Sequence, residues 1–258
     1  MLFDSHSHFH GEKFDDDRDA ALERAHAAGV SRILTLGVDI EESRRAIALA
    51  EKHPEIFAAA GFHPSSAAGW NDEAAAALET LLDHPRVPVL GEIGIDYYWN
   101  RDPVFVEQQH RAFREQLRMA RRRGLPVSIH SRDANADVLK ILGEEHGDEI
   151  GGVLHCFAGT EEDARRGIEM GFFLGVGGTS TYPKSEDLRI VLRSIGVDHL
   201  IVETDAPYLP PQPKRGKRNE PAFVRISAER LAETLGIPFE ECAARTYANT
   251  LKAFRLEE

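Results

Sequence analysis

Residues 1–9 read MLFDSHSHF, a short stretch that begins with apolar residues and carries, near its end, two histidines separated by one serine. The same design recurs along the chain, where short runs rich in Val, Ile, Leu and Phe each have Gly, His, Asp or Glu at or near their ends. Such runs lie at residues 1–9, 32–38, 57–63, 87–96, 126–130, 152–157, 172–177 and 200–205. Because they are apolar almost throughout, we expect strands that are buried on both faces of a parallel sheet.

Segments with helical spacing separate these runs. They predict helices at residues 15–28, 41–52, 107–123, 160–170 and 220–235. Gly124 after a basic last turn is typical of a helix end, and Thr160 with Asp163 resembles a helix N-cap. Strands that alternate with helices predict an α/β fold, a single closed (β/α)8 TIM-like barrel over residues 1–258 with its active site at the C-terminal mouth of the strands. An open doubly wound sheet is the alternative, but its glycine-rich phosphate-binding turn does not follow the first run.

The composition is that of a globular protein. The chain has 258 residues, of which 42% are hydrophobic and 29% charged, and this excludes a disordered or fibrous class. It contains no apolar stretch long enough for a transmembrane helix, and its first residues lack the basic start and apolar core of a signal peptide. Cys156 and Cys242 cannot make a disulfide framework. We therefore expect a cytoplasmic protein with no membrane partner. A net charge of −12 argues against a uniformly basic nucleic-acid coat, although not against a local basic patch.

Polar side chains at the ends of buried runs predict a metal centre. His6 and His8 lie two apart on the first run, so their imidazoles face the same side. Four further residues end or interrupt other runs: Glu92, His130, His155 and Asp205. Buried carboxylates and imidazoles need partners, and in a barrel all of these side chains converge on one mouth. They supply enough ligands for two divalent ions that share one carboxylate.

Other residues near the predicted mouth have more than one interpretation each. His63 is a further metal ligand, a phosphate contact or an ordinary loop histidine. Glu203 either orients a ligand histidine or is simply a polar residue packed near the mouth. Residues 97–99, Tyr-Tyr-Trp, either stack on bases or cover the barrel end. Cys156 is expected to pack rather than to bind metal.

A basic run lies in the proline-rich loop of residues 206–221, directly after the last predicted strand. It reads KRGKR at residues 214–218 and is followed by Asn219. A charge run is usually just a solvated surface. Beside a barrel mouth that binds metal, however, Arg215, Arg218 and Asn219 become candidate contacts to phosphate groups.

Several of these stretches together resemble the TatD family of metal-dependent deoxyribonucleases, which belongs with the amidohydrolase-like barrel enzymes. The matching segments are FDSHSHF, GFHP, LGEIGIDYY, PVSIHSRDA, LHCFAG, IVETDAPYLPPQPKRGKRNEP and YANTLKAF, in that order along nearly the whole chain. The resemblance implies that His6, His8 and Asp205 hold a first metal. It also implies that His130 and His155 hold a second metal and that Glu92 bridges the two.

The resemblance further implies hydrolysis of DNA phosphodiester bonds, often as a 3′ to 5′ exonuclease, with two divalent ions that are Mg, Mn or Zn. In this hypothesis a hydroxide held between the ions attacks phosphorus, Asp205 accepts the water's proton, and His63 with the basic loop steadies the phosphate. Two alternatives stay open. One is a hydrolase of other esters or amides, such as aminoacyl-tRNA, on the same metal centre. The other is a non-catalytic scaffold stabilised by metal. The native metal and the oligomeric state, a monomer among the options, are not fixed by the sequence.

Overall fold

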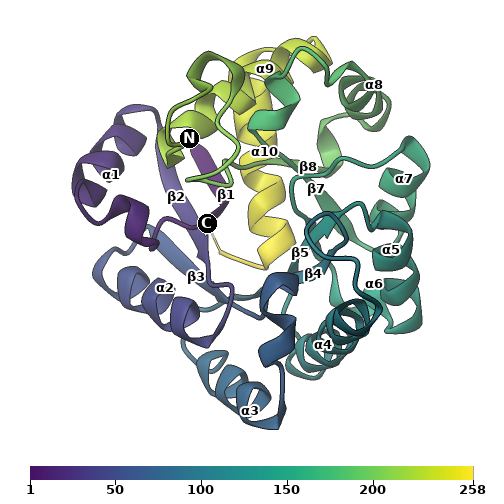
Figure 1. Ribbon diagram of the computed structural model, residues 1–258. Coiled ribbons are helices and arrows are strands. Elements are labelled where there is room, and N and C mark those ends of the chain that lie inside the picture. Colours follow the sequence, from purple (N-terminus) through teal and green to yellow (C-terminus); the bar gives the residue numbers. More distant parts are fainter. Residues whose placement is uncertain (258) are drawn as a thin grey trace.

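The strands form one parallel sheet that closes into a barrel. The computed structural model describes residues 1–257. Its strands are β1 (Leu2–Ser7), β2 (Val30–Leu36), β3 (Ile56–Ala60), β4 (Val89–Asp96), β5 (Val127–Arg132), β6 (Gly152–Leu154), β7 (Phe172–Val176) and β8 (Leu200–Val202). Neighbours along the chain are neighbours in the sheet, and a bridge between Ser7 and Ala206 joins its two edges. The predicted (β/α)8 barrel is confirmed, with a strand at each expected run (Figure 1).

The helices lie around the outside of this barrel, except the last one, which crosses one end of it (Figure 1). They are α1 (Arg18–Ala27), α2 (Ile40–Lys52), α3 (Asp72–Leu81), α4 (Pro103–Arg123), α5 (Asn135–Glu144), α6 (Gly147–Ile150), α7 (Glu161–Glu169), α8 (Glu186–Ile195), α9 (Val224–Leu235) and α10 (Phe239–Phe254). Short 3₁₀ turns lie between them: η1 (Glu12–Phe14), η2 (Pro64–Gly69), η3 (Gly178–Thr181), η4 (Val197–His199), η5 (Gln212–Lys214) and η6 (Pro221–Phe223). Within residues 1–257, none of the helices combines the length and apolar character needed to cross a membrane.

Local signals in the sequence set several helix ends. Thr160 and Asp163 form a reciprocal capping box at the start of α7, as their spacing predicts. Gly124 ends α4 with a left-handed φ of 66°, which suits glycine. The start of α4 at Pro103 is earlier than predicted, because the Asp102 side chain caps the helix by accepting the amide hydrogens of Val104 and Phe105.

The apolar core has an outer and an inner part. The outer part fills the space between the sheet and the surrounding helices. The inner part takes apolar side chains from every strand except β5, together with Leu251, Ala253 and Phe254 at the end of α10. Many of its strand members stand at the beginnings of their strands, so α10 closes the N-terminal end of the barrel. In Figure 1 this helix crosses the middle of the ring.

We expect the closing contact of α10 to carry much of the fold's stability. Phe254 is 1% exposed, and replacing it with alanine leaves a cavity under the barrel. Phe254→Ala should therefore lower the free energy of unfolding by about 3–5 kcal/mol, measured by urea denaturation. Lys252→Ala, an exposed change on the same helix turn, should change it by less than about 0.5 kcal/mol. A loss below about 1 kcal/mol for Phe254→Ala would show that α10 does not seal the barrel.

Candidate metal centre

The structure gathers all six predicted metal ligands at the C-terminal mouth of the barrel. They come from the ends of different strands: His6 from β1, His8 just after it, Glu92 from β4, His130 from β5, His155 after β6 and Asp205 after β8. The Nε2 atom of His8 lies 3.6 Å from Oδ1 of Asp205, and that of His6 lies 4.0 Å from it. Residues separated by up to two hundred positions in the chain thus meet in one site.

Glu92 stands at the middle of this site. Its Oε2 atom lies 3.5 Å from Nε2 of both His6 and His8. Its Oε1 atom lies 3.0 Å from Nδ1 of His130 and 3.8 Å from Nε2 of His63. The two oxygens of one buried carboxylate therefore face two different pairs of imidazoles.

Three histidines of the site share one orientation. The Nδ1 atom of His8 lies 2.8 Å from the carbonyl oxygen of Leu36, and that of His6 lies 3.2 Å from Oγ of Ser128. In each ring, contacts on the Nδ1 side leave Nε2 facing the carboxylates. Such an anchor fixes the ring in the orientation that a metal ligand needs.

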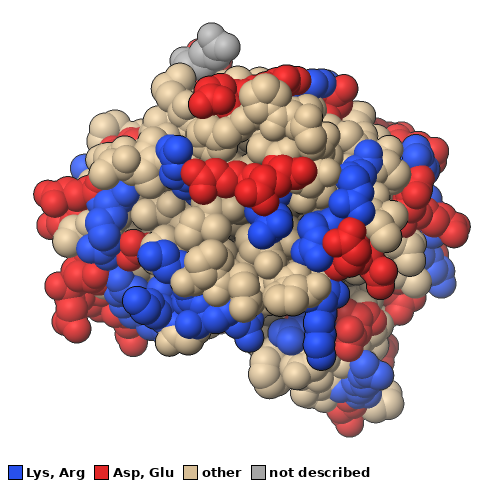
Figure 2. Space-filling view, turned by 90° about the horizontal axis from the view of Figure 1, so that it is seen from above, with Lys and Arg blue, Asp and Glu red and all other residues tan. Residues whose placement is uncertain are grey.

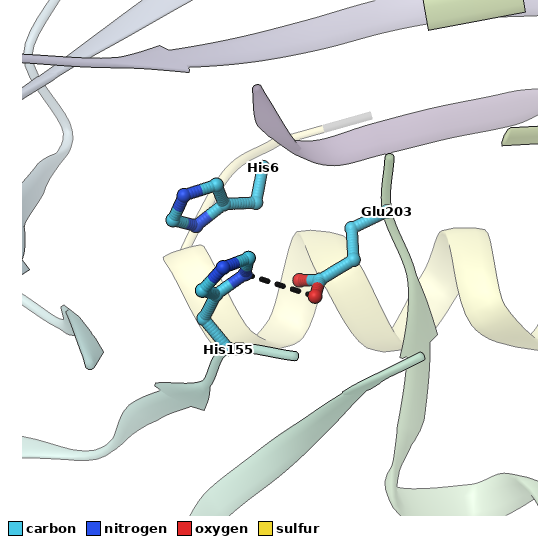
Figure 3. A group of neighbouring side chains, drawn as sticks. All are labelled: His6, His155 and Glu203. Atoms are coloured by element: carbon cyan, nitrogen blue, oxygen red, sulfur yellow. Dashed lines mark ion pairs between the residues drawn. The ribbon is translucent and has the colours of Figure 1, made fainter. Parts of the chain in front are cut away.

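His155 is the third of these histidines, and Glu203 anchors it. The His155 ring stacks on His6 with 3.4 Å between ring centres, and its Nδ1 atom lies 2.9 Å from Oε1 of Glu203 (Figure 3). The same Glu203 oxygen accepts the Cys156 amide hydrogen. This placement favours a role for Glu203 in orienting His155 over a role in packing alone. The Cys156 thiol faces Thr179 instead of the ligand group.

Asp96 is a part of the site that we did not single out from the sequence. Its Oδ2 atom lies 2.9 Å from Nε2 of His130, and it is 5% exposed. A usable signal was present, because Asp96 ends the same apolar run as Glu92 at an even spacing and so shares its face. Gly94 between them has a φ of 144°, and a Cβ there would collide with the carbonyl oxygen of His130. Glycine thus allows β4 and β5 to approach closely beside the site.

A buried polar framework positions Asp205. The carboxylate of Asp4 accepts both the amide hydrogen and the hydroxyl hydrogen of Thr204. The amide of Asp205 donates to the carbonyl of His6, which ties the end of β8 to β1. Asp205 itself has a φ of 58°, an uncommon conformation for a non-glycine residue that turns the chain toward the mouth.

The electrostatics of the site favour bound cations. Burial would raise the pKa of Glu92, but His63, His6 and His130 hold it well below its usual range. Burial likewise opposes protonation of His130 and His155, yet the facing carboxylates raise the pKa of each to about 9. The carboxylate of Glu92 is therefore ionised and attracts positive charge.

The donor set fits divalent metal ions. Ligand atoms of His6, His8 and Asp205 lie within 4.8 Å of one another, and so do those of His63, Glu92 and His130. The buried Nε2 atom of His6 has no hydrogen-bond partner within the described chain, which is costly unless something else binds it. Mixed imidazole and carboxylate ligands suit Zn and also admit Mn or Mg.

Asn219 and Arg218 do not occupy the positions expected of substrate contacts. Asn219 is fully buried, and its amide donates to the carbonyls of Thr204 and Tyr208, so it organises the loop after β8. The Arg218 guanidinium forms two hydrogen bonds of 2.6 and 2.8 Å with the carboxylate of Asp17 and lies over the ring of Phe14. These contacts give both residues a structural role, which corrects the sequence-based expectation.

Arg215 remains available on the surface of the same loop. It is exposed, lies over the ring of Tyr182, and has no carboxylate within 4.0 Å among residues 1–257. Lys13, Lys214 and Lys217 likewise have no carboxylate within 4.0 Å among residues 1–257. Figure 2 shows one face of the molecule, on which basic and acidic side chains are interspersed. This face is not uniformly basic, as expected for a chain with a net charge of −12.

Comparisons with known proteins point in one direction. Residues 3–255 match the family model described as TatD related DNase. The chain is 40% identical over 256 residues to an uncharacterized metal-dependent hydrolase, YabD, of Bacillus subtilis, covering 99% of this chain and 100% of that protein. It is also 40% identical to the 3′-5′ ssDNA/RNA exonuclease TatD of Cronobacter turicensis, with 98% and 97% covered. The crystal structure of the TatD homolog YJJV from Escherichia coli superposes with a TM-score of 0.93 at 34% identity, covering 99% and 98% of the two chains.

Divalent metal should stabilise this protein through Glu92. With metal at about a hundred times its dissociation constant, the free energy of unfolding should rise by about 3 kcal/mol, visible as a higher Tm in thermal denaturation. Glu92→Gln removes the charge that faces both imidazole pairs, so its Tm should respond much less to metal. His26 forms an ion pair on the outer helix α1, away from the site, so the Tm of His26→Ala should respond to metal as that of the unchanged protein does. An unchanged metal response in Glu92→Gln would contradict the assignment of Glu92 as a shared ligand.

The Asp17–Arg218 pair should stabilise the loop after β8. The Arg218 hydrogen bond lowers the pKa of Asp17 from 3.8 to about 2. A carboxylate with a depressed folded-state pKa stabilises the fold fully above about pH 4 and loses that effect as the pH falls toward 2. Because both groups are partly exposed, we expect a coupling of only about 0.5–1 kcal/mol in a double-mutant cycle of Asp17→Asn and Arg218→Gln near pH 7. The coupling should shrink near pH 3, and a coupling that does not depend on pH would rule out an ionic origin.

Proposed function

Because the chain belongs to the TatD-related DNase family of metal-dependent hydrolases, we propose that it hydrolyses phosphodiester bonds of single-stranded nucleic acid, DNA above all, from the 3′ end. One observation supports this most strongly: a single buried carboxylate, Glu92, presents one oxygen to His6 and His8 and the other to His130. This is the arrangement that a pair of neighbouring divalent ions requires. The relative from Cronobacter turicensis, whose name states a 3′-5′ activity on ssDNA and RNA, supports the substrate class.

The assignment of ligands in this proposal is the one that the family resemblance implies. His6, His8 and Asp205 would hold one ion, and His130 with His155 would hold a second, with Glu92 as the shared ligand; in the structure the ligand atom of His130 lies within 4.8 Å of those of Glu92 and His63. Glu203 and Asp96 hold the rings of His155 and His130 in place through their other nitrogens. Two ions bound there would act as Lewis acids toward the phosphoryl group and lower the pKa of water.

Asp205 is the residue that accepts the proton of the attacking water in this proposal. Burial acts to raise the pKa of Asp205, but a hydrogen bond from His8 and the charge of His155 keep it below its usual value. The carboxylate is therefore ionised at neutral pH and can take up a proton on Oδ1. This oxygen faces His8 at 3.6 Å and His155 at 3.8 Å, at the centre of the site.

His63 is suited to hold a phosphate oxygen. Burial lowers the pKa of His63 to about 4, so the ring is neutral at pH 7. Its Nδ1 atom accepts the amide hydrogen of Ser65, which leaves the single ring proton on Nε2. That Nε2–H group faces the site near Glu92 and can donate to an oxygen of the substrate. This contact gives His63 a role in binding the phosphate, next to the metal ligands themselves.

Unpaired basic groups around the loop after β8 favour a polyanionic substrate over a small neutral ester. Arg215 and the lysines near it are free of ion pairs among residues 1–257. Such groups can neutralise phosphates on either side of the bond that is cleaved. Arg215→Gln should therefore raise KM for an oligonucleotide several-fold and leave hydrolysis of a small phenyl ester unchanged.

The direct test is nucleotide release from a single-stranded oligodeoxynucleotide labelled at its 5′ end. In the presence of Mg, Mn or Zn the labelled strand should shorten stepwise from the 3′ end. Glu92→Gln should reduce kcat by at least about a hundredfold, because the shared carboxylate holds both ions. His26→Ala is the matched control and should keep the unchanged rate.

Aminoacyl-tRNA and small esters serve as competing substrates in the same assay. If one of them is cleaved with a higher kcat/KM than the oligonucleotide under every metal, the site is a hydrolase for that class. If the correctly folded, metal-loaded protein releases no nucleotide, the nuclease proposal is wrong.

A further inference from the structure

Large exposed aromatic side chains lie at the C-terminal end of the barrel, beside the proposed metal centre. Among the described residues, the large hydrophobic side chains that stand out into solvent include three aromatic ones: Tyr98, Trp99 and Tyr208. They are 54%, 75% and 50% exposed. Tyr98 and Trp99 follow β4, and Tyr208 follows β8, so these rings stand on loops from opposite sides of the mouth. Exposed aromatic rings grouped beside a polar site are candidates for contact with a ligand.

The loop after β4 is built to hold its rings in place. Oδ1 of Asp96 accepts the amide hydrogens of both Tyr98 and Trp99, while Oδ2 of the same carboxylate contacts His130. The hydroxyl of Tyr97 contacts His110 and donates to Asp137, which anchors the base of the loop. One carboxylate therefore connects the exposed rings directly to a proposed metal ligand.

Each exposed aromatic group carries a cation on its face. The Arg132 guanidinium lies 3.8 Å from the centre of the Tyr98 ring and 5.5 Å from that of Trp99. Arg132 is exposed and, within residues 1–257, has no carboxylate within 4.0 Å. On the other side, the ammonium group of Lys13 lies 4.6 Å from the centre of the Tyr208 ring. These cations are thus held beside the rings without being neutralised.

Tyr208 adjoins the metal centre from its own side. Its ring lies 5.9 Å from the ring of His8, edge to face. The two aromatic groups consequently flank the site: Tyr208 lies beside His8, and the Tyr98–Trp99 pair is joined through Asp96 to His130. A strand of nucleotides that runs across the mouth would place a phosphate at the centre and a base over each group.

An aromatic ring with an adjacent cation matches the chemistry of a nucleotide. Bases stack on aromatic rings whatever their sequence, and the cation can pair with the neighbouring phosphate. This local recognition suits a chain with a net charge of −12, which cannot rely on a broad basic surface.

We propose that Tyr98–Trp99–Arg132 and Tyr208–Lys13 are two base-stacking subsites that hold the nucleotides on either side of the scissile phosphate. The inference rests on the proposed nuclease function for the direction of the strand, but it concerns binding and can be tested without turnover. It names single-stranded nucleic acid, DNA or RNA, as the ligand, because only unpaired bases offer free faces to the rings.

The chain offers an internal reporter for the first subsite. Of its two tryptophans, Trp99 is 75% exposed, whereas Trp70 is 6% exposed and donates to Glu115. Titration of the full-length protein with phosphorothioate oligothymidine, which resists cleavage, should quench the fluorescence of Trp99 in a saturable way. An oligomer of equal length and charge that lacks bases should give little quenching. Trp99→Phe should abolish the signal.

Affinity, read by fluorescence anisotropy of a labelled oligomer, tests both subsites. Trp99→Ala and Tyr208→Ala should each raise Kd about tenfold, while Trp99→Phe and Tyr208→Phe should stay within about threefold. Arg132→Ala should weaken binding and reduce its dependence on salt. Arg225→Ala is the matched control, since Arg225 also lies over an aromatic ring, Phe239, but contacts the carbonyl of Ala28 at the other end of the barrel.

Two results would overturn the inference: equal Kd values for the oligomers with and without bases, or unchanged Kd values in both alanine variants of the aromatic residues. Failure of the proposed function gives a different pattern. In that case oligothymidine would still quench Trp99, but no nucleotide would be released from ordinary DNA in the presence of metal.

Discussion

The concentration of buried ionisable groups at one end of the barrel is the constraint on which the structure depends. Glu92, Glu203 and His6 are almost inaccessible to water, and isolated charges in such positions are strongly unfavourable. They are tolerated because each group faces an opposite or complementary one, and because cations can satisfy the nitrogen of His6 that has no hydrogen-bond partner among residues 1–257. The polar framework around them, from Asp4 to Asn219, holds the carboxylates and imidazoles at fixed separations.

The barrel separates this polar end from an apolar one. At the N-terminal end, Phe254 and its neighbours from α10 cover the inner core. At the opposite end, the same strands terminate in the residues proposed as metal ligands, and their loops carry the exposed aromatic and basic groups. Stability and chemistry therefore rest on different ends of the same strands, and substitutions at the mouth can change activity while the core remains packed. The loop after β8 contributes both to stability and to ligand binding. Asn219 donates to its backbone and Arg218 pairs with Asp17, whereas Arg215 stays free to contact ligands.

The sequence predicted the strands, and it singled out the polar residues that gather at the mouth, because both have simple one-dimensional signals. A buried parallel strand is an uninterrupted apolar run, and a histidine or acid at its end is conspicuous. The predicted helices do not include α3, α5, α6, α8 and α10. In α3 the run of alanines gives only a weak apolar face. The pairing of Arg218 with Asp17 and the burial of Asn219 could not be predicted, since both depend on how a long proline-rich loop folds back on α1 and β8. The partnership of Asp96 with His130 depends equally on the register between β4 and β5.

The central claim is that Glu92 lies between two cations at the mouth of the barrel. Anomalous X-ray diffraction from crystals of the full-length protein grown with manganese tests it most directly, because each bound ion produces its own peak. The account predicts two peaks, one beside His8 and Asp205 and one beside His130, with the Glu92 carboxylate between them. Peaks elsewhere, or a single peak that Glu92 does not contact, would contradict it.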